Sequence, residues 1–185
     1  MATSGPRIVT ALLALLSLTA STPEVSAAPE YQVKAAFLYN FAKFVEWPEA
    51  SLPSDEITIC ILGRDPFGKI IDAAVSGKTV RGRRLRVRRY RTAPAARSCQ
   101  LLFLARSERQ RIAQVTEALR GAPVLIVSDA DRFGEPGGMV NLVIDQNRVR
   151  IEINVVNVRE AGLEISSRLL TLAVLTGEDT ARTER

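Results

Sequence analysis

Side chains that could perform catalysis or hold a metal are scarce in this sequence. Its 185 residues include no histidine, which removes the commonest general base and the commonest zinc ligand. No Walker or GxGxxG motif occurs, and the Gly137-Gly138 pair is typical of a tight turn before a strand. Carboxylates, serines and lysines are present, but no spacing brings them together. We therefore predict a protein that is not an enzyme and that uses no metal or cofactor.

One group of carboxylates has the oxygen atoms that a cation would need. Asp129, Asp131 and Glu135 follow one another closely in the sequence. The remaining ligands of a calcium-binding loop are missing, so we interpret this segment as a solvated turn.

The N-terminus has the pattern of a secretory signal peptide. Arg7 is followed by thirteen uncharged residues, 8–20, and small residues lead up to Ala28. Such a stretch is too short to span a bilayer but suits the hydrophobic region of a signal. We expect cleavage after Ala27, so that residues 1–27 are removed and the mature chain is periplasmic. The alternative is an uncleaved anchor or a core helix.

The mature chain fits one domain, residues 28–176, followed by a flexible tail at 177–185. Its two cysteines are Cys60 and Cys99, and an even number in an exported protein favours a disulfide. A disulfide between Cys60 and Cys99 would close a loop of 40 residues. In the chain-entropy model, closing such a loop contributes ~4 kcal/mol to the free energy of unfolding. Two buried free thiols are the alternative, because cysteine also packs well as a small hydrophobic residue.

Positive charge is concentrated in one part of the chain. Residues 64–111 hold 14 basic and 3 acidic residues, a net +11 within a chain whose net charge is +5. Seven of these basic residues are arginines in the segment 81–91. Because export makes nucleic acid an unexpected partner, the remaining targets are anionic lipid headgroups at the membrane surface or an acidic protein face. We favour a simpler interpretation, a solvated edge strand whose arginines discourage edge-to-edge pairing.

Short apolar runs alternate with helical periodicity along the chain. In chain order, the predicted elements are a helix at 30–47, a strand at 57–62, a helix at 67–75, an edge strand at 85–90, a strand at 101–105, a helix at 107–119, a strand at 124–127, a hairpin of 139–144 with 149–153, and a helical region at 155–175 that is bent near Gly162. Asp65 and Ser107 are the expected caps of the second and third helices. This order predicts an α/β fold, a three-layer sandwich in which helices flank a mixed, mostly parallel sheet, with a C-terminal hairpin and helix.

The first predicted helix carries six of the ten aromatic residues. Tyr39 and Trp47 point less clearly inward and are candidates for an interface. One face of this helix is expected in the core, and it consists of Val33, Phe37, Phe41 and Phe44.

Four blocks of residues, taken together, resemble the YfiR family of periplasmic proteins. They are FLYNFAKFVEWP at 37–48, ILGRDPFG at 61–68, GGMV at 137–140, and an ending with INV at 153–155 and AGLEISSRLL at 161–170. Each block is weak by itself, but the set is specific because the blocks occur in order over nearly the whole mature chain.

The resemblance implies a periplasmic repressor that binds the sensory part of a membrane-bound diguanylate cyclase. Proteins of this kind lower cyclic-di-GMP output and so restrain exopolysaccharide and biofilm. The resemblance also implies a homodimer, and a disulfide whose redox state is linked to control. Cys60 and Cys99 fit the placement of that bridge. A second bridge of some members is absent here, since the chain has two cysteines.

Two classes of function remain open at this stage. The first is a protein-binding repressor, which an exposed apolar patch rimmed by charge would favour. The second is a periplasmic sensor of a small molecule, which a cleft with convergent polar groups at the strand ends would favour. The candidate partner-contact residues are Tyr39, Trp47, Arg83, Arg86, Arg88 and Arg91.

Overall fold

The computed structural model describes Met1 and residues 27–52, 55–134 and 137–177. Three predicted features lie wholly or largely outside these residues. They are the signal peptide, the C-terminal tail after Gly177, and the carboxylate of Glu135. The helices are α1 (Ala27–Phe44), α2 (Lys69–Val75), α3 (Ile112–Ala118), α4 (Val155–Glu160) and α5 (Ser167–Leu170), and the 3-10 segments are η1 (Glu49–Ser51), η2 (Pro94–Ser98) and η3 (Arg106–Arg111). The strands are β1 (Val45–Glu46), β2 (Glu56–Leu62), β3 (Thr79–Val80), β4 (Arg83–Tyr90), β5 (Leu101–Leu104), β6 (Leu125–Ser128), β7 (Val140–Asp145), β8 (Arg148–Asn154), β9 (Glu164–Ile165) and β10 (Ala173–Thr176).

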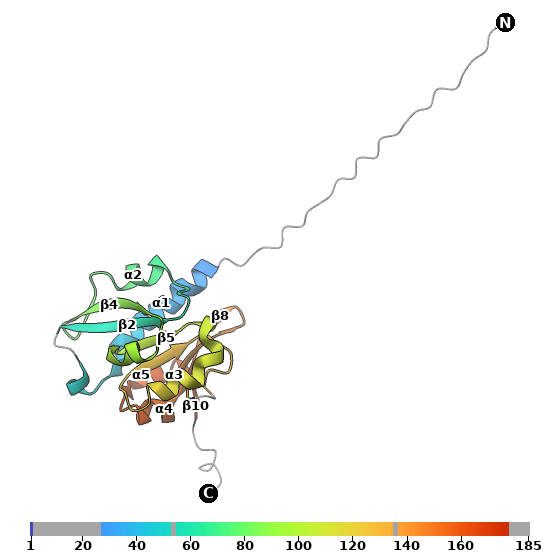
Figure 1. Cartoon of the computed structure of the whole chain (residues 1–185). Helices are drawn as coiled ribbons and strands as arrows, with labels where there is room; N and C mark the ends of the chain where they lie inside the picture. Colours follow the sequence, from blue (N-terminus) through green and yellow to red (C-terminus); the bar gives the residue numbers. More distant parts are fainter. Residues whose placement is uncertain (2–26, 53–54, 135–136, 178–185) are drawn as a thin grey trace.

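Eight strands form one sheet in the order β10-β8-β7-β6-β5-β2-β4-β3 (Figure 1). Neighbours from β7 through β6, β5 and β2 to β4 are parallel, and β10 is parallel to β8. The β7–β8 hairpin and the short β3 are antiparallel to their neighbours. The predicted mixed, mostly parallel sheet with a C-terminal hairpin is therefore confirmed.

The central strands are mostly apolar because helices cover both faces of the sheet. Every residue of β5 and β6 is buried, so no polar alternation survives in either strand. The crossovers from β2 to β4 and from β5 to β6 run in opposite directions across the sheet. Because such crossovers are right-handed, α2 and α3 lie on opposite faces. In Figure 1, α3 and α4 lie in front of the sheet and α1 lies behind it.

Aromatic rings join α1 and the start of α2 to the sheet. Tyr31 of α1 meets Phe67 edge to face with 5.3 Å between ring centroids, and Phe67 meets Phe103 of β5 in the same way at 4.8 Å. Phe67 and Phe103 are buried. This chain of rings belongs to one core cluster that extends through the described residues. In the same part of the chain, no helix is long and apolar enough to cross a bilayer.

The core-facing side of α1 differs in part from the predicted one, since only Phe41 of the four expected residues is fully buried. Val33 is 45% exposed, and Phe37 and Phe44 are half-buried, whereas Lys34 is fully buried. The helix is turned so that Lys34 faces inward, where it pairs with Asp129. The buried apolar face consists of Ala35, Leu38, Phe41 and Ala42, which also have helical spacing, so the sequence contains two overlapping apolar stripes and the prediction chose the other one.

The predicted helical region at 155–175 is interrupted at Gly162, where a bend was expected, and only α5 is helical beyond it. Gly162 adopts a left-handed conformation with φ +71° and ends α4. The backbone N–H groups of Leu163 and Gly162 bond to the carbonyls of Val158 and Arg159, which is the Schellman arrangement. The chain then forms β9, the single-turn α5 and β10, so that a strand replaces the expected end of the helix.

Neither expected residue is a helix cap, since the N-cap residues of α2 and α3 are Gly68 and Arg111. Asp65 accepts hydrogen bonds from the backbone N–H groups of Phe67 and Gly68, in the turn that leads into α2. Ser107 caps nothing, because it lies inside η3 and its Oγ accepts a bond from the N–H of Arg64. The predicted third helix is therefore a 3-10 segment followed by the shorter α3.

Cys60 and Cys99 form the expected disulfide, with 6.1 Å between their Cα atoms. Cys60 lies within β2, and Cys99 lies just before β5, the neighbour of β2 in the sheet. Both residues are buried in the core. The bridge therefore closes the long segment that contains α2, β3 and β4 onto the centre of the sheet.

Substitution of Cys99 by serine should lower the free energy of unfolding by about 2–5 kcal/mol. The reason is that the unfolded chain regains the freedom of the closed loop, while a hydroxyl group is left in a buried position. Urea unfolding followed by circular dichroism measures the change. The double variant Cys60→Ser/Cys99→Ser is the control, because it removes the bridge without leaving a free thiol at Cys60. Two titratable thiols in denatured, unreduced protein would contradict the bridge.

Candidate functional site

The carboxyl ends of the parallel strands meet a buried ion pair. Asp129 directly follows β6, and Lys34 reaches it from α1, with 2.6 Å between Nζ and Oδ2. Neither side chain is exposed to solvent. Because an isolated buried charge is very unfavourable, each of these residues requires the other.

Three more side chains complete what we call the polar cluster, which consists of Glu30, Tyr31, Lys34, Arg106 and Asp129. The Tyr31 hydroxyl donates to Oδ2 of Asp129 at 2.9 Å, and Glu30 pairs with Lys34 one helical turn away. Arg106 donates from Nη2 to the backbone carbonyl of Asp129 at 2.9 Å. Burial, and then the negative charge of Asp129, raise the pKa of the Tyr31 hydroxyl above its ordinary value.

The polar cluster and η3 fill the place where open α/β sheets usually bind a ligand. That place is the crevice beyond the carboxyl ends of the strands, where the strand order reverses. Here the order reverses between β2 and β5. A Cβ atom on Gly63, the residue after β2, would lie 2.7 Å from side-chain atoms of both Ser107 and Glu108. Among the described residues this crevice is therefore packed with side chains.

The interpretation of Asp129 as part of a solvated turn is wrong. Its side chain is fully buried, and its Oδ1 atom has no hydrogen-bond partner among the described residues. The same residues contain no group of carboxylates or cysteines that could hold a metal ion. Two signals in the sequence do point to the ion pair. Asp129 directly follows a buried strand, and Glu30 precedes Lys34 at a spacing that lets them pair on a helix.

Trp47, a candidate for partner contact, is a buried anchor. Its side chain is 7% exposed, and its indole N–H donates to the backbone carbonyl of Gln100 at 2.9 Å. The Gln100 side chain in turn accepts a bond from the N–H of Thr58. Gln100 follows Cys99 directly, so the chain after α1 is held beside the disulfide. The expectation that Trp47 lies at the surface is corrected by this burial.

Tyr39 is half-buried and lies against two lysines. The Nζ atom of Lys78 lies 4.2 Å from the centre of its ring, and that of Lys43 lies 5.4 Å from it. Cations at these distances are attracted to the face of the ring. The part of Tyr39 that remains accessible is thus surrounded by positive charge.

The arginines at and around β4 are paired with carboxylates from other segments. The pairs are Arg81 with Glu46, Arg83 with Glu49, Arg84 with Asp55, Arg86 and Arg88 with Glu56, and Arg89 with Asp65 and Asp72. Of the four arginines predicted to contact a partner, Arg91 has no ion pair among the described residues. Most of these side chains stay exposed, so each pair contributes little to stability.

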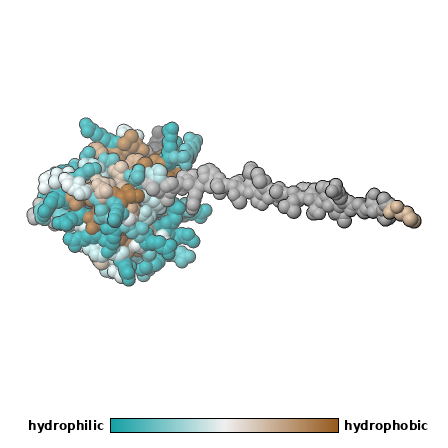
Figure 2. Space-filling view, turned by 90° about the horizontal axis from the view of Figure 1, so that it is seen from above, coloured by the Kyte–Doolittle hydropathy of each residue, from teal (hydrophilic) through white to brown (hydrophobic). Residues whose placement is uncertain are grey.

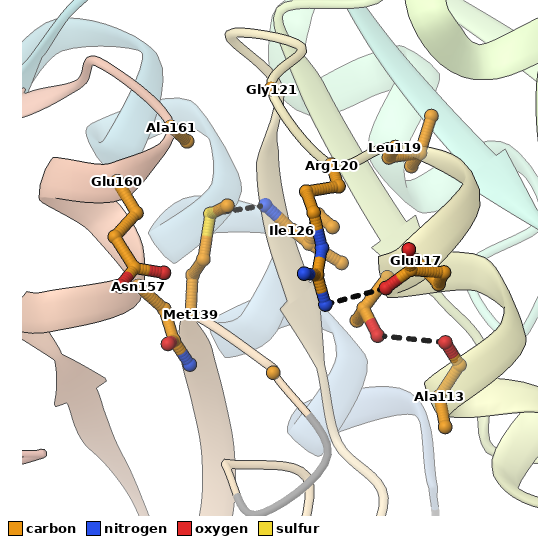
Figure 3. Close-up of a pocket in the computed structure, with 12 residues that line it drawn as sticks. Ala113, Glu117, Leu119, Arg120, Gly121, Ile126, Met139, Asn157, Glu160 and Ala161 are labelled. Atoms are coloured by element: carbon orange, nitrogen blue, oxygen red, sulfur yellow. Dashed lines mark hydrogen bonds and ion pairs between the residues drawn. The ribbon is translucent and has the colours of Figure 1, made fainter.

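A groove of about 340 Å³ separates α3 from α4 (Figure 3). Its floor includes Ile126 of β6 and Met139, and the Met139 sulfur accepts a hydrogen bond from the Ile126 N–H at 3.4 Å. Glu117 and Arg120 pair with each other on the α3 side, and Glu160 lies on the α4 side. The groove exists because the described part of the β6–β7 connection contains no helix that would cover this part of the sheet.

Large apolar side chains are exposed at the opposite edge of the sheet from the arginines. Leu172 is 72% exposed, Val174 53% and Leu175 40%. We call residues 172–175 the apolar edge segment. Within the described residues β10 pairs with β8 alone, and the segment contains no charge. The face seen in Figure 2 is mostly hydrophilic with small apolar areas, so a concentration of this kind indicates an interaction surface.

Comparison with known proteins places these features within a described family. A family model described as YfiR/HmsC-like matches residues 31–174. The matched range includes the disulfide, most of the polar cluster and the start of the apolar edge segment. A search of curated proteins finds no significant match to the chain.

Substitution of Lys34 by methionine should lower the free energy of unfolding by about 3–5 kcal/mol, because Asp129 is then buried without its cation. The double variant Lys34→Met/Asp129→Leu should recover most of this loss, since neither charge remains. Guanidinium unfolding monitored by fluorescence gives these values. Lys43→Met, on the exposed side of the same helix, is the control and should change stability by less than about 0.5 kcal/mol. A double variant no more stable than the single one would contradict the interpretation.

The raised pKa of Tyr31 predicts a loss of stability at alkaline pH. The folded state favours the protonated hydroxyl, so its contribution is full below the unfolded pKa of about 10 and is lost as the pH rises through the folded value. Tyr31→Phe should cost about 1–3 kcal/mol at neutral pH, because it removes a hydrogen bond to a charged group. Its stability should then fall less steeply than that of the wild type above about pH 10. Thermal unfolding across this range, with Tyr90→Phe as the control, tests the difference, and equal slopes would refute it.

Proposed function

The chain belongs to the YfiR/HmsC-like family, and we propose that it is a periplasmic regulator that binds and represses a membrane-bound diguanylate cyclase. Binding takes place at the sensory part of the cyclase outside the cytoplasm. The result is lower cyclic-di-GMP and weaker biofilm formation. The observation that carries the proposal is the family match over residues 31–174. This range contains all four of the sequence blocks that resemble the family.

The apolar edge segment supports binding of a protein. Apolar side chains that become buried in an interface supply most of its binding energy, and full burial of one leucine or valine is worth about 1.5–3 kcal/mol. Leu172, Val174 and Leu175 are available for this, whereas Trp47 is already buried in the fold. We therefore assign the main partner contact to residues 172–175, with Tyr39 as a further candidate.

Repression requires a difference in affinity between two states of the cyclase. The regulator lowers activity if it binds the inactive state more tightly than the active one. A difference of about 3 kcal/mol shifts the balance between the two states roughly 150-fold. Such a regulator needs no catalytic groups, which agrees with a chain that has no histidine.

The second candidate function is a sensor that binds a small molecule and passes its state to a membrane partner. The observation that favours it is the groove between α3 and α4, which has an apolar floor and charged rims. Its volume of about 340 Å³ lies near the lower end of the usual range for ligand sites. The crevice beyond the strand ends, where this class of fold usually binds a ligand, is filled by the polar cluster. These two observations make the protein-binding function the stronger proposal.

Deletion of the gene should raise cyclic-di-GMP and surface attachment, and the exported wild-type protein should reverse both. The variant Leu172→Asp should bind its partner about tenfold more weakly, because a charge replaces the most exposed apolar side chain. Cyclic-di-GMP measured in the complemented strains, and pull-down of the tagged protein from detergent-extracted membranes, give the two readouts.

Val33→Asp is the matched control, because it places the same charge on another exposed apolar residue, in α1. This variant should repress as well as the wild type. If deletion leaves cyclic-di-GMP unchanged while a neighbouring cyclase is expressed, the repressor proposal fails and the sensor function takes its place. If Leu172→Asp and Val33→Asp behave alike, the assignment of the contact to residues 172–175 fails.

A further inference from the structure

The outer edge of β4 is largely uncovered. β2 pairs with β4 over seven residues, from Arg84 to Tyr90, on the inner side. On the outer side, β3 pairs only with Arg83 and Arg84, and one more bond runs from the Leu85 N–H to the Lys78 carbonyl. Beyond Leu85, no described strand pairs with this edge, which therefore offers backbone donors and acceptors to another strand.

A groove runs beside this uncovered edge. It has a volume of about 490 Å³ and lies between the turn after α2 and the first half of β4. Apolar side chains of Val75, Leu85 and Val87 line it together with the cations Lys78, Arg84 and Arg86. The one carboxylate in the lining, Asp72, is already paired with Arg89. A strand that pairs with β4 would thus meet apolar contacts on one side and positive charge on the other, because successive side chains alternate between the faces.

Positive charge at this edge exceeds the negative charge that pairs with it. Arg86 and Arg88 share the single carboxylate of Glu56. Both arginine side chains remain more than half exposed. Lys78 has no carboxylate partner among the described residues and lies over the Tyr39 ring instead. The edge can therefore accept further carboxylates without losing the pairs that it already has.

We propose that the outer edge of β4 is a second binding site, which takes an extended acidic segment of a partner protein as an added strand. The segment alternates acidic and apolar residues. Its carboxylates meet Arg86 and Arg88, and its apolar side chains enter the groove beside Leu85 and Val87. Its backbone completes the hydrogen bonds of β4, as in other cases of strand addition.

A lipid surface fits this edge less well than a peptide does. Anionic headgroups could satisfy the arginines, but they cannot bond in register to a row of backbone groups, and a flat surface does not enter a groove. The proposal is independent of the cyclase, because the apolar edge segment lies at the other end of the strand order. It can therefore fail or succeed apart from the proposed function.

The test uses the exported protein and an eight-residue fluorescent peptide of alternating glutamate and valine, as long as β4. Fluorescence anisotropy at low salt should show binding that weakens as salt is added. The variant Arg86→Gln/Arg88→Gln should bind roughly tenfold more weakly. The matched control Arg109→Gln/Arg148→Gln removes the same charge from other exposed positions and should bind as the wild type does.

Hydrogen exchange separates strand addition from simple charge attraction. The peptide should slow exchange of the backbone amides of Val87 and Arg89, which face the outer edge because the N–H of Leu85 does and successive N–H groups alternate sides. An alternating lysine and valine peptide should not bind. Equal weakening in both double variants, or binding without protection of these amides, would overturn the proposal. So would binding of phosphatidylglycerol vesicles that depends on Arg86 and Arg88 while the peptide does not bind, because the site would then be a lipid site.

Discussion

A lysine and an aspartate without any solvent exposure determine how the first helix lies on the sheet. Lys34 and Asp129 are 95 residues apart in the chain, and neither charge is tolerable in the core without the other. Their contact ties α1 to the end of β6 beside the apolar residues Leu38 and Phe41, and it seals the carboxyl ends of the central strands. The binding surfaces of the protein are therefore at its edges, and the crevice at the strand ends, where this class of fold usually places a ligand, is filled.

The charges of the chain are separated in the sequence and mixed again in the fold. The carboxylates of Glu46, Glu49, Asp55 and Glu56 precede the arginine-rich segment and lie beside it once β2 and β4 are paired in parallel. A strand with so many like charges would otherwise repel itself. The disulfide holds the same region, since it closes the segment that carries β4 onto the centre of the sheet.

Much of the fold could be predicted from the sequence, because buried parallel strands are short apolar runs and need no partner to be recognised. The runs at 57–62, 101–105 and 124–127 and the hairpin correspond to β2, β5, β6 and β7–β8. The C-terminal segment could not be predicted in the same way. The glycine at 162 signals the end of α4, but Ala173–Thr176 pairs in register with β8, and pairing with a distant strand is not visible in periodicity. Burial of Trp47 was missed for the same reason, since its partner Gln100 lies 53 residues away.

The two edges of the sheet have opposite chemistry, and this difference follows from how each edge is protected. An uncovered edge strand tends to pair with other chains unless charge, a bulge or a short neighbour prevents it. β4 has arginines and the two-residue β3 beside it, whereas β10 has exposed apolar side chains and no charge. Protection by charge still admits a strand of the opposite charge, so the β4 edge is selective and not closed. Within the described residues nothing protects the β10 edge, which would be an aggregation hazard in a free protein, and its persistence in a folded regulator is best explained by a partner that covers it.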